Sequence, residues 1–195
     1  MTPTRLNALT DGVVAIVLTI MVLELKLPAE PTLGAVLAVL PLLAAYLLAF
    51  VNVAIYWNNH HHMMASAHRV TGGVLWANHS LLFCLTLFPL MIRWIDEAGI
   101  TPLPVASFGV VLICASAAYF VLERTLIRAE GEESPVKRAV GGGFKEWISF
   151  ALYVAAVPAA FISPLISVAI YVAVSIVWLI PDPRFERQLF GRTEK

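Results

Sequence analysis

Long apolar runs separated by short polar segments fill the sequence from about residue 6 to about residue 181. A helix that crosses a bilayer needs about 20 predominantly apolar residues, and prolines stand at the joints between the runs, where helices start or stop. The pattern predicts an all-α integral membrane protein with six transmembrane helices. The expected spans are about 6–27, 35–60, 72–95, 104–127, 145–162 and 164–181.

The last two spans are separated only by Ile162, Ser163 and Pro164. This short joint suits a tight hairpin between two helices, and it equally suits one helix with a kink at Pro158 or Pro164. No segment has the length and polarity of a soluble domain. We therefore expect residues 1–195 to form a single six-helix membrane domain.

Composition agrees with this class. Hydrophobic residues make up 59% of the chain and charged residues 13%, with a mean hydropathy of +0.82. Soluble domains carry about 45–50% apolar and about 25% charged residues. Thirteen basic residues balance thirteen acidic ones, so the net charge gives no indication of a nucleic-acid partner.

The placement of Lys and Arg predicts the orientation, because basic residues collect in cytoplasmic loops. With the N-terminus inside, only Lys26 and Arg93 fall outside. The other eleven fall inside: Arg5, Arg69, Arg124, Arg128, Lys137, Arg138, Lys145, Arg184, Arg187, Arg192 and Lys195. This bias requires an even number of spans and places both termini in the cytoplasm. The hydrophilic loop 129–145 has no predicted function, and its three glycines lack the Gly-Lys-Ser/Thr ending of a P-loop.

Ionisable groups at the edge of a bilayer are candidates for function. Arg5 alone would be read as a side chain that reaches the headgroups. Asp11 lies about a turn and a half further in and needs partners. Trp57 and His60 share one face of the second helix, and Asn78 lies near the start of the third. Alternation of the helices places all of them at one depth, so we expect a hydrogen-bonded cluster.

Beyond Asp11, the first helix carries a stripe of Ile16, Thr19 or Ile20, and Leu23 at helical spacing. Taken alone, such a stripe is typical of a helix that faces lipid or other helices, with Thr19 bonded to its own backbone. The three consecutive histidines that follow Asn59 are about 100° apart around a helix, so they cannot share one face. We therefore predict no metal site and no cofactor.

The first helix carries a motif that resembles a known family. Arg5-x-x-x-Leu9-Thr10-Asp11 is similar to the Arg-x-x-x-Phe-Ser-Asp signature of the transmembrane protein 175 family, the endolysosomal potassium channels and their bacterial homologues. Leu9 replaces Phe and Thr10 replaces Ser. The similarity continues along the chain in Trp57-x-x-His60, Asn78 and Leu87-Phe88-Pro89. It covers helices one to three, and the later helices by number and hydropathy only.

The resemblance implies a homotetramer of single six-helix units in a bacterial inner membrane, with a pore lined by the first helix and no Thr-Val-Gly-Tyr-Gly filter. It implies a hydrophobic constriction at Ile16 and further layers at Thr19 or Ile20 and at Leu23. It also implies an inter-helix network that holds the pore helix in place, formed by Arg5, Asp11, Trp57, His60 and Asn78.

These implied roles are physically reasonable. A ring of Ile16 side chains would block ions by dewetting. A ring of Thr19 hydroxyls would replace part of the hydration shell of K⁺, with weaker selectivity than a carbonyl filter. Glu24 would attract cations to the outer mouth unless Lys26 cancels its charge.

The leading hypothesis is a passive, potassium-selective leak channel, with potassium ions, the lipid bilayer and identical subunits as partners. The alternative is a proton-coupled secondary transporter that uses Asp11 and His60 as a relay. Such transporters often have broken helices, whereas the first helix contains no internal proline after its start. No nucleophile–base pair or metal cluster is readable, so we do not expect an enzyme.

Overall fold

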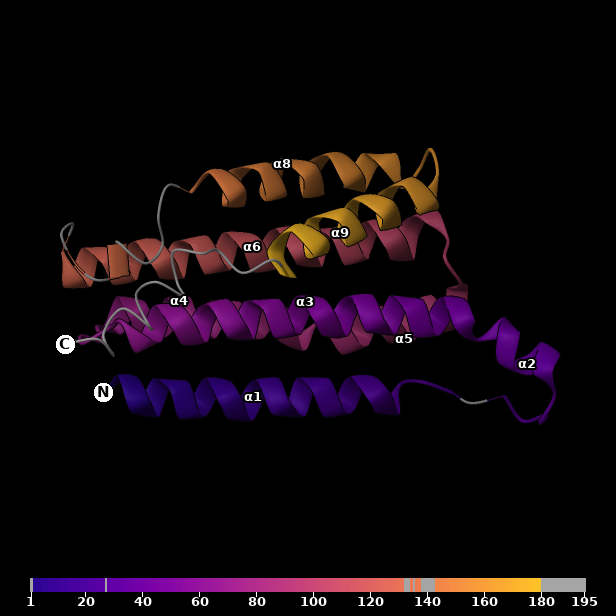
Figure 1. The fold of residues 1–195 in the computed structure, drawn as a ribbon, viewed down its shortest axis with the longest axis horizontal. Coiled ribbons are helices and arrows are strands. Elements are labelled where there is room, and N and C mark those ends of the chain that lie inside the picture. Colours follow the sequence, from indigo (N-terminus) through magenta and orange to yellow (C-terminus); the bar gives the residue numbers. More distant parts are fainter. Residues whose placement is uncertain (1, 27, 132–133, 135, 138–142, 180–195) are drawn as a thin grey trace, which may run out of the picture.

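The computed structural model describes residues 2–26, 28–131, 134, 136–137 and 143–179. Within them all regular secondary structure is helical (Figure 1). The helices are α1 (Pro3–Leu23), α2 (Leu33–Ala38), α3 (Leu40–Ala65), α4 (Gly72–Thr86), α5 (Phe88–Ala98), α6 (Pro102–Glu130), α8 (Phe144–Ala159) and α9 (Pro164–Leu179). Arg138 and the basic residues at 184, 187, 192 and 195, which contributed to the predicted orientation, lie outside the described residues.

Four segments are long and apolar enough to cross a bilayer. They are Pro3–Leu23, Leu40–Ala65, Gly72–Ala98 and Pro102–Glu130. The helices α8 and α9 have 16 residues each, fewer than the roughly 20 that a full crossing usually takes. The described chain therefore contains four membrane-length helical segments and a shorter pair.

Two predicted spans are interrupted, which the sequence prediction missed. The span 35–60 is divided at Val39 into α2 and α3, and α3 continues to Ala65. The span 72–95 is divided at Leu87 into α4 and α5. The reason is the same at both places: a proline at the second position of the following helix has no N–H to donate to the preceding turn.

The joint between the last two helices was left open by the sequence, and the structure shows a hairpin. The helix α8 ends at Ala159, and α9 begins at Pro164 after a short turn. Pro158 lies inside the last turn of α8 without ending it. Pro164 is well placed at the start of α9, because the first helical position needs no backbone donor.

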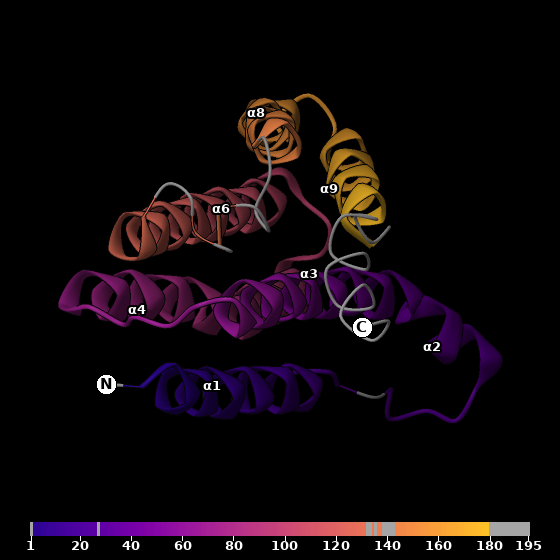
Figure 2. The same ribbon diagram turned by 60° about the vertical axis from the view of Figure 1, so that its left-hand side comes forward.

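The helices lie roughly side by side in layers (Figures 1 and 2). The first helix, α1, lies on one side and packs against α3, α4 and α5. The opposite side is formed by α6, α8 and α9, and α6 packs against α4, α5, α8 and α9. This arrangement leaves α1 at the edge of the subunit, with one face covered and the other open.

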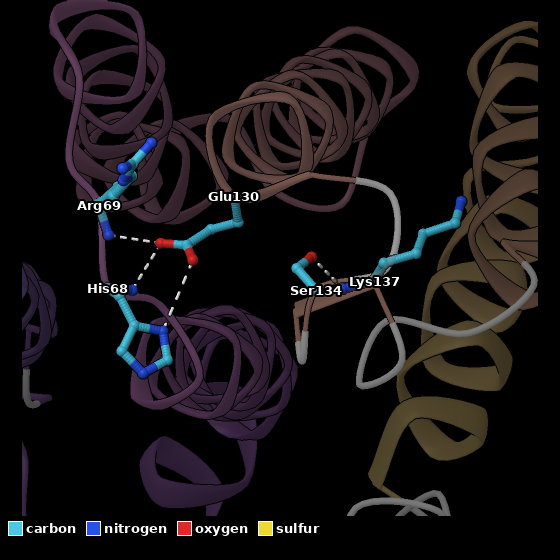
Figure 3. A network of polar contacts seen from close by, with 5 residues as sticks. All are labelled: His68, Arg69, Glu130, Ser134 and Lys137. Carbon is cyan, nitrogen blue, oxygen red and sulfur yellow. Dashed lines mark hydrogen bonds and ion pairs between the residues drawn. The ribbon is translucent and has the colours of Figure 1, made fainter.

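A carboxylate fastens the loop between α3 and α4 (Figure 3). Glu130, the last residue of α6, accepts hydrogen bonds from the backbone N–H groups of His68, at 2.6 Å, and Arg69. Its other oxygen lies 3.5 Å from Nδ1 of His68. The Glu130 side chain is only 7% exposed, so these contacts satisfy an acid that would otherwise be costly to bury. The loop is thereby fixed to the end of α6 next to α4.

Candidate functional site: a polar cluster and an open stripe on the first helix

The covered face of α1 contains one polar residue among apolar ones. Its buried residues are Leu6, Thr10, Val14, Val17 and Met21. They recur at intervals of three and four, the spacing of one helical face. The apolar members pack against α3, α4 and α5. The hydroxyl of Thr10 therefore needs a polar partner on a neighbouring helix.

Asn78 of α4 is that partner, and it also binds His60 of α3. The Asn78 amide nitrogen donates to Oγ1 of Thr10 at 3.1 Å. Its amide oxygen lies 2.8 Å from Nε2 of His60, a bond in which the imidazole Nε2–H donates. All three residues are at most 3% exposed. One buried amide thus joins α1, α3 and α4.

A second contact joins α1 to α3 nearer the surface. The indole Nε1–H of Trp57 donates to Oδ1 of Asp11 at 2.8 Å. Trp57 is 38% exposed and its ring stacks on that of His61, with 5.9 Å between ring centroids. A charged acceptor strengthens this hydrogen bond relative to a neutral one.

The predicted network residues are not all brought together. Trp57 meets Asp11, and His60 meets Asn78, but no hydrogen bond joins these two pairs in the described chain. Arg5 is exposed, and its side chain has no hydrogen bond or ion pair with another described residue. Its place in the network stays a prediction.

Sequence reasoning gave no role to Thr10 of this cluster, or to Asn7 on the same helix. Thr10 was noted only as a substitution in the motif, although its spacing from Leu6 and Val14 placed it on the buried face. The amide oxygen of Asn7 is also buried and has no hydrogen-bond partner among the described residues. No sequence pattern indicated that second feature, because Asn7 stands next to the buried face.

The open face of α1 carries the predicted pore residues. Ile16 is 58% exposed, Ile20 40% and Leu23 79%, and Thr19 is exposed as well. At about 100° per residue, Ile16 and Leu23 lie almost in line, with Thr19 on one flank and Ile20 on the other. The Thr19 hydroxyl donates to the carbonyl of Ile16 at 2.9 Å. Large apolar side chains thus line a surface that no described part of this subunit covers.

The far end of α1 carries charges. Lys26 lies 3.4 Å from Asp96 at the end of α5, so its ammonium is directed to that carboxylate. Arg93 pairs with Glu97 at 3.0 Å and also lies within electrostatic range of Glu24. Glu24 therefore has a cationic neighbour in Arg93 as well as in Lys26.

No group of three or more metal-binding side chains occurs within the described ranges. The described parts define a multi-pass helical membrane protein in which polar contacts fix a first helix that has an open apolar stripe.

Comparison with known proteins gives the family. The model of the family described as "Endosomal/lysosomal potassium channel TMEM175" matches residues 5–89. A protein from Chryseobacterium sp. (strain P1-3), "Potassium channel HX13_20290", is 45% identical over 97% of this chain and 98% of its own length. "Potassium channel Cha6605_3372" from Chamaesiphon minutus is 33% identical over about half of each chain, at 50% and 51%.

A solved structure agrees with the fold. The crystal structure of a lysosomal potassium-selective channel TMEM175 homolog from Chamaesiphon minutus superposes with a TM-score of 0.80 and 23% identity, covering 91% of this chain and 96% of that one. The chain belongs to the TMEM175 potassium channel family, which is not a family of enzymes.

Proposed function

We propose that the chain is one subunit of a homotetrameric potassium channel whose pore is lined by α1. The observation that carries the proposal is the exposure of Ile16, Thr19 and Leu23 on one stripe of a helix whose opposite face is buried. The relative that matches 97% of this chain is named a potassium channel, which supports K⁺ as the permeant ion. Conduction would be passive, through a hydrophobic constriction without a carbonyl filter.

The proposal includes the organisation of the subunit. Residues 1–195 form one membrane domain with six crossings, in which α8 and α9 make the last two. Both termini lie in the cytoplasm, and the membrane is the inner membrane of a bacterium. The excess of Lys and Arg on that side supports this orientation.

Within the pore, Ile16 forms the constriction, and Leu23 and Ile20 extend the apolar surface. An apolar ring stops ions when its diameter is too small to remain wet. Thr19 offers hydroxyl oxygens to a partly dehydrated ion. Glu24 adds negative charge near the outer mouth.

The polar cluster positions this stripe. A hydrogen bond from Asn78 to Thr10 and one from Trp57 to Asp11 fix the rotation of α1 about its own axis, because each bond is directional. We assign Arg5 to the same function through contacts in the assembled tetramer.

Ion flux tests the function. Purified protein in proteoliposomes should conduct K⁺ under an applied voltage with no pH gradient, and Ile16→Asn should raise the flux because a polar ring stays wet. Ala151→Asn is the control, since it introduces the same side chain at an exposed residue of α8, away from the stripe of α1. A strict requirement for a proton gradient would refute the channel. Unchanged flux in Ile16→Asn would remove Ile16 as the constriction.

Subunit number tests the assembly separately. Native mass spectrometry of the detergent-solubilised protein should give four copies of the chain. A monomer or dimer that still conducts would leave the ion specificity intact and overturn the tetrameric pore.

A further inference from the structure

A cavity of about 210 Å³ lies among α3, α6, α8 and α9. The helices α6, α8 and α9 lie on the side of α3 away from α1 (Figure 2). Aromatic side chains form much of its wall, among them Tyr56, Phe120, Phe150, Tyr153 and Trp178. An apolar cavity of about 150 Å³ is enough to bind benzene. This cavity is therefore large enough for a hydrocarbon group.

The cavity is elongated along the bundle. Its lining on α3 runs from Asn52 to Asn59, and its lining on α8 runs from Glu146 to Tyr153. Seven residues of helix rise by about 10 Å. Val121 and Trp147 also line it while being 52% and 60% exposed, so the cavity reaches the protein surface at α6 and α8. A long, narrow shape with a side opening suits a flexible chain.

Two cationic side chains lie on aromatic rings of this wall, toward the C-terminal end of α6 and the N-terminal end of α8. The guanidinium carbon of Arg124 lies 4.7 Å from the centroid of the Phe120 ring. The ammonium of Lys145 lies 4.7 Å from the centroid of the Trp178 ring. Cation–π contacts of this kind hold the charge at the rim of the cavity.

Arg124 retains an unused donor. Its Nε is buried and makes no hydrogen bond within the described residues. Among the described residues, the carboxylate oxygen paired with it belongs to Glu123 and is 3.8 Å away, too far for a hydrogen bond. The Arg124 side chain as a whole is 42% exposed, so a phosphate oxygen can reach the outer N–H groups of its guanidinium, for which it is a strong acceptor.

Carboxylates at the same rim influence the choice of ligand. Glu123 and Glu146 lie within electrostatic range of each other, and both Arg124 and Lys137 act on Glu123. Among the described residues at this rim, Arg124 and Lys145 lie on aromatic rings of the cavity wall, and Glu123 lies beside Arg124. A phosphate would be attracted to these two cations, which would repel an organic cation. Glu146 would in turn attract the ammonium group of a zwitterionic headgroup.

We propose that this cavity binds an acyl chain of a glycerophospholipid whose phosphate is held by Arg124 and Lys145. Basic groups between membrane helices are a recurring form of headgroup recognition. The site is separate from the open stripe of α1, so the proposal does not depend on the pore.

The test measures thermal unfolding of delipidated protein in detergent as dioleoylphosphatidylethanolamine is added. The lipid should raise the midpoint of the wild type. Arg124→Gln should raise the half-saturating lipid concentration about fivefold, because it removes the charged donor to the phosphate. Ala117→Phe, which fills the cavity, should abolish the shift. Arg128→Gln, an exposed arginine one turn further along α6, should behave like wild type.

The outcomes distinguish the lipid from its parts. Glycerophosphoethanolamine, which has the headgroup and no acyl chains, should cause no shift; an equal shift would indicate a simple phosphate site and overturn the proposal. Equal lipid response in wild type, Arg124→Gln and Ala117→Phe would overturn it as well.

A second measurement uses wild-type protein only and does not depend on variants that fold. A phospholipid with a diazirine in its acyl chain should label cavity residues of α6 and α8 after illumination. Labels spread evenly over the exposed surfaces of α4 and α8 would contradict a specific site.

Discussion

The two sides of α3 pack against their neighbouring helices in different ways. Toward α1 and α4, His60 is buried against Asn78, and Asn78 is bonded in turn to Thr10. Toward α6, α8 and α9, Asn52 and Tyr56 line a cavity whose wall is largely aromatic. Both sides contain hydrogen bonds between helices, since the Asn52 amide donates to Oγ of Ser175 on α9 at 3.0 Å. The second side differs in the space that its side chains leave between them.

The two sides of α3 meet different requirements of the helix bundle. A hydrogen bond fails when the angle between its groups changes, so the first side fixes the orientation of α1. An aromatic wall with free volume tolerates a change of occupant, so the second side is suited to a ligand. Substitutions on the two sides should therefore differ in cost even when their chemistry is the same.

Asn78→Leu is expected to have the largest effect. The new side chain has a similar size but leaves Nε2 of His60 and the hydroxyl of Thr10 buried without their partner. We expect a loss of about 3 kcal/mol in unfolding free energy, since each buried polar group without a hydrogen-bond partner costs about 1–3 kcal/mol. Thermal unfolding in detergent micelles measures the loss.

The control makes the same change on the other side of α3. Asn59 lines the cavity, and its amide donates to the carbonyl of Ile55 in its own helix. Asn59→Leu should cost less than about 1 kcal/mol. Equal losses in the two variants would show that the sides do not differ in this way.

Gly109→Ala tests the tightest contact on the α9 side. A Cβ at this position would lie 2.1 Å from the hydroxyl and 2.9 Å from Cζ of Tyr171, which is itself 1% exposed. Tyr171 would have to move and give up its hydrogen bond to the carbonyl of Val105. The expected loss is about 2 kcal/mol, typical of overpacking.

Gly72→Ala is the control for Gly109→Ala, because a Cβ at Gly72 meets nothing within 4 Å. Its unfolding midpoint should match that of wild type. If Gly109→Ala unfolds at the wild-type temperature too, close packing between α6 and α9 contributes nothing to stability.

Trp57→Phe removes the indole donor to Asp11 and keeps an aromatic ring. The site is partly exposed, so water can replace the lost donor, and we expect a loss of about 1 kcal/mol. Trp76→Phe, at a tryptophan that is 76% exposed, is the matched control. A loss as large as that of Asn78→Leu would place the main anchor of α1 at Asp11 instead of at Thr10.

Ala117→Leu should have the smallest effect. Ala117 lines the cavity, so the added carbons enter free volume, and the change should stay within about 0.5 kcal/mol. Ala115→Leu, two residues away on α6, places the same carbons at a position that is 0% exposed and should cost about 1–3 kcal/mol. Similar losses would mean that the cavity wall is as rigid as the core.

Several structural features were predictable because they depend on neighbours in the chain. Apolar runs identify the positions of α1, α3, α6 and α9, since the hydropathy of a segment is a local property. The breaks before Pro41 and Pro89 were missed, although proline at each site carried the necessary signal. A window average of hydropathy does not register the loss of one backbone donor.

The polar cluster was only partly predictable. Helical spacing and membrane depth placed His60 and Asn78 at one level. They did not reveal that Asn78 also binds Thr10, or that Trp57 and not His60 reaches Asp11. Such pairings depend on the rotation of each helix about its axis, which is set by packing along its whole length.

By itself, the sequence determined the class of protein, the positions of its long apolar segments and the motif at the start of the first helix. These follow from the cost of exposing apolar residues to water and of placing charge in lipid. Only the tertiary structure decided which face of α1 is covered, which amide binds Thr10, and that α3, α6, α8 and α9 enclose a cavity. Each of these depends on contacts between residues far apart in the chain, whose geometry no local pattern contains.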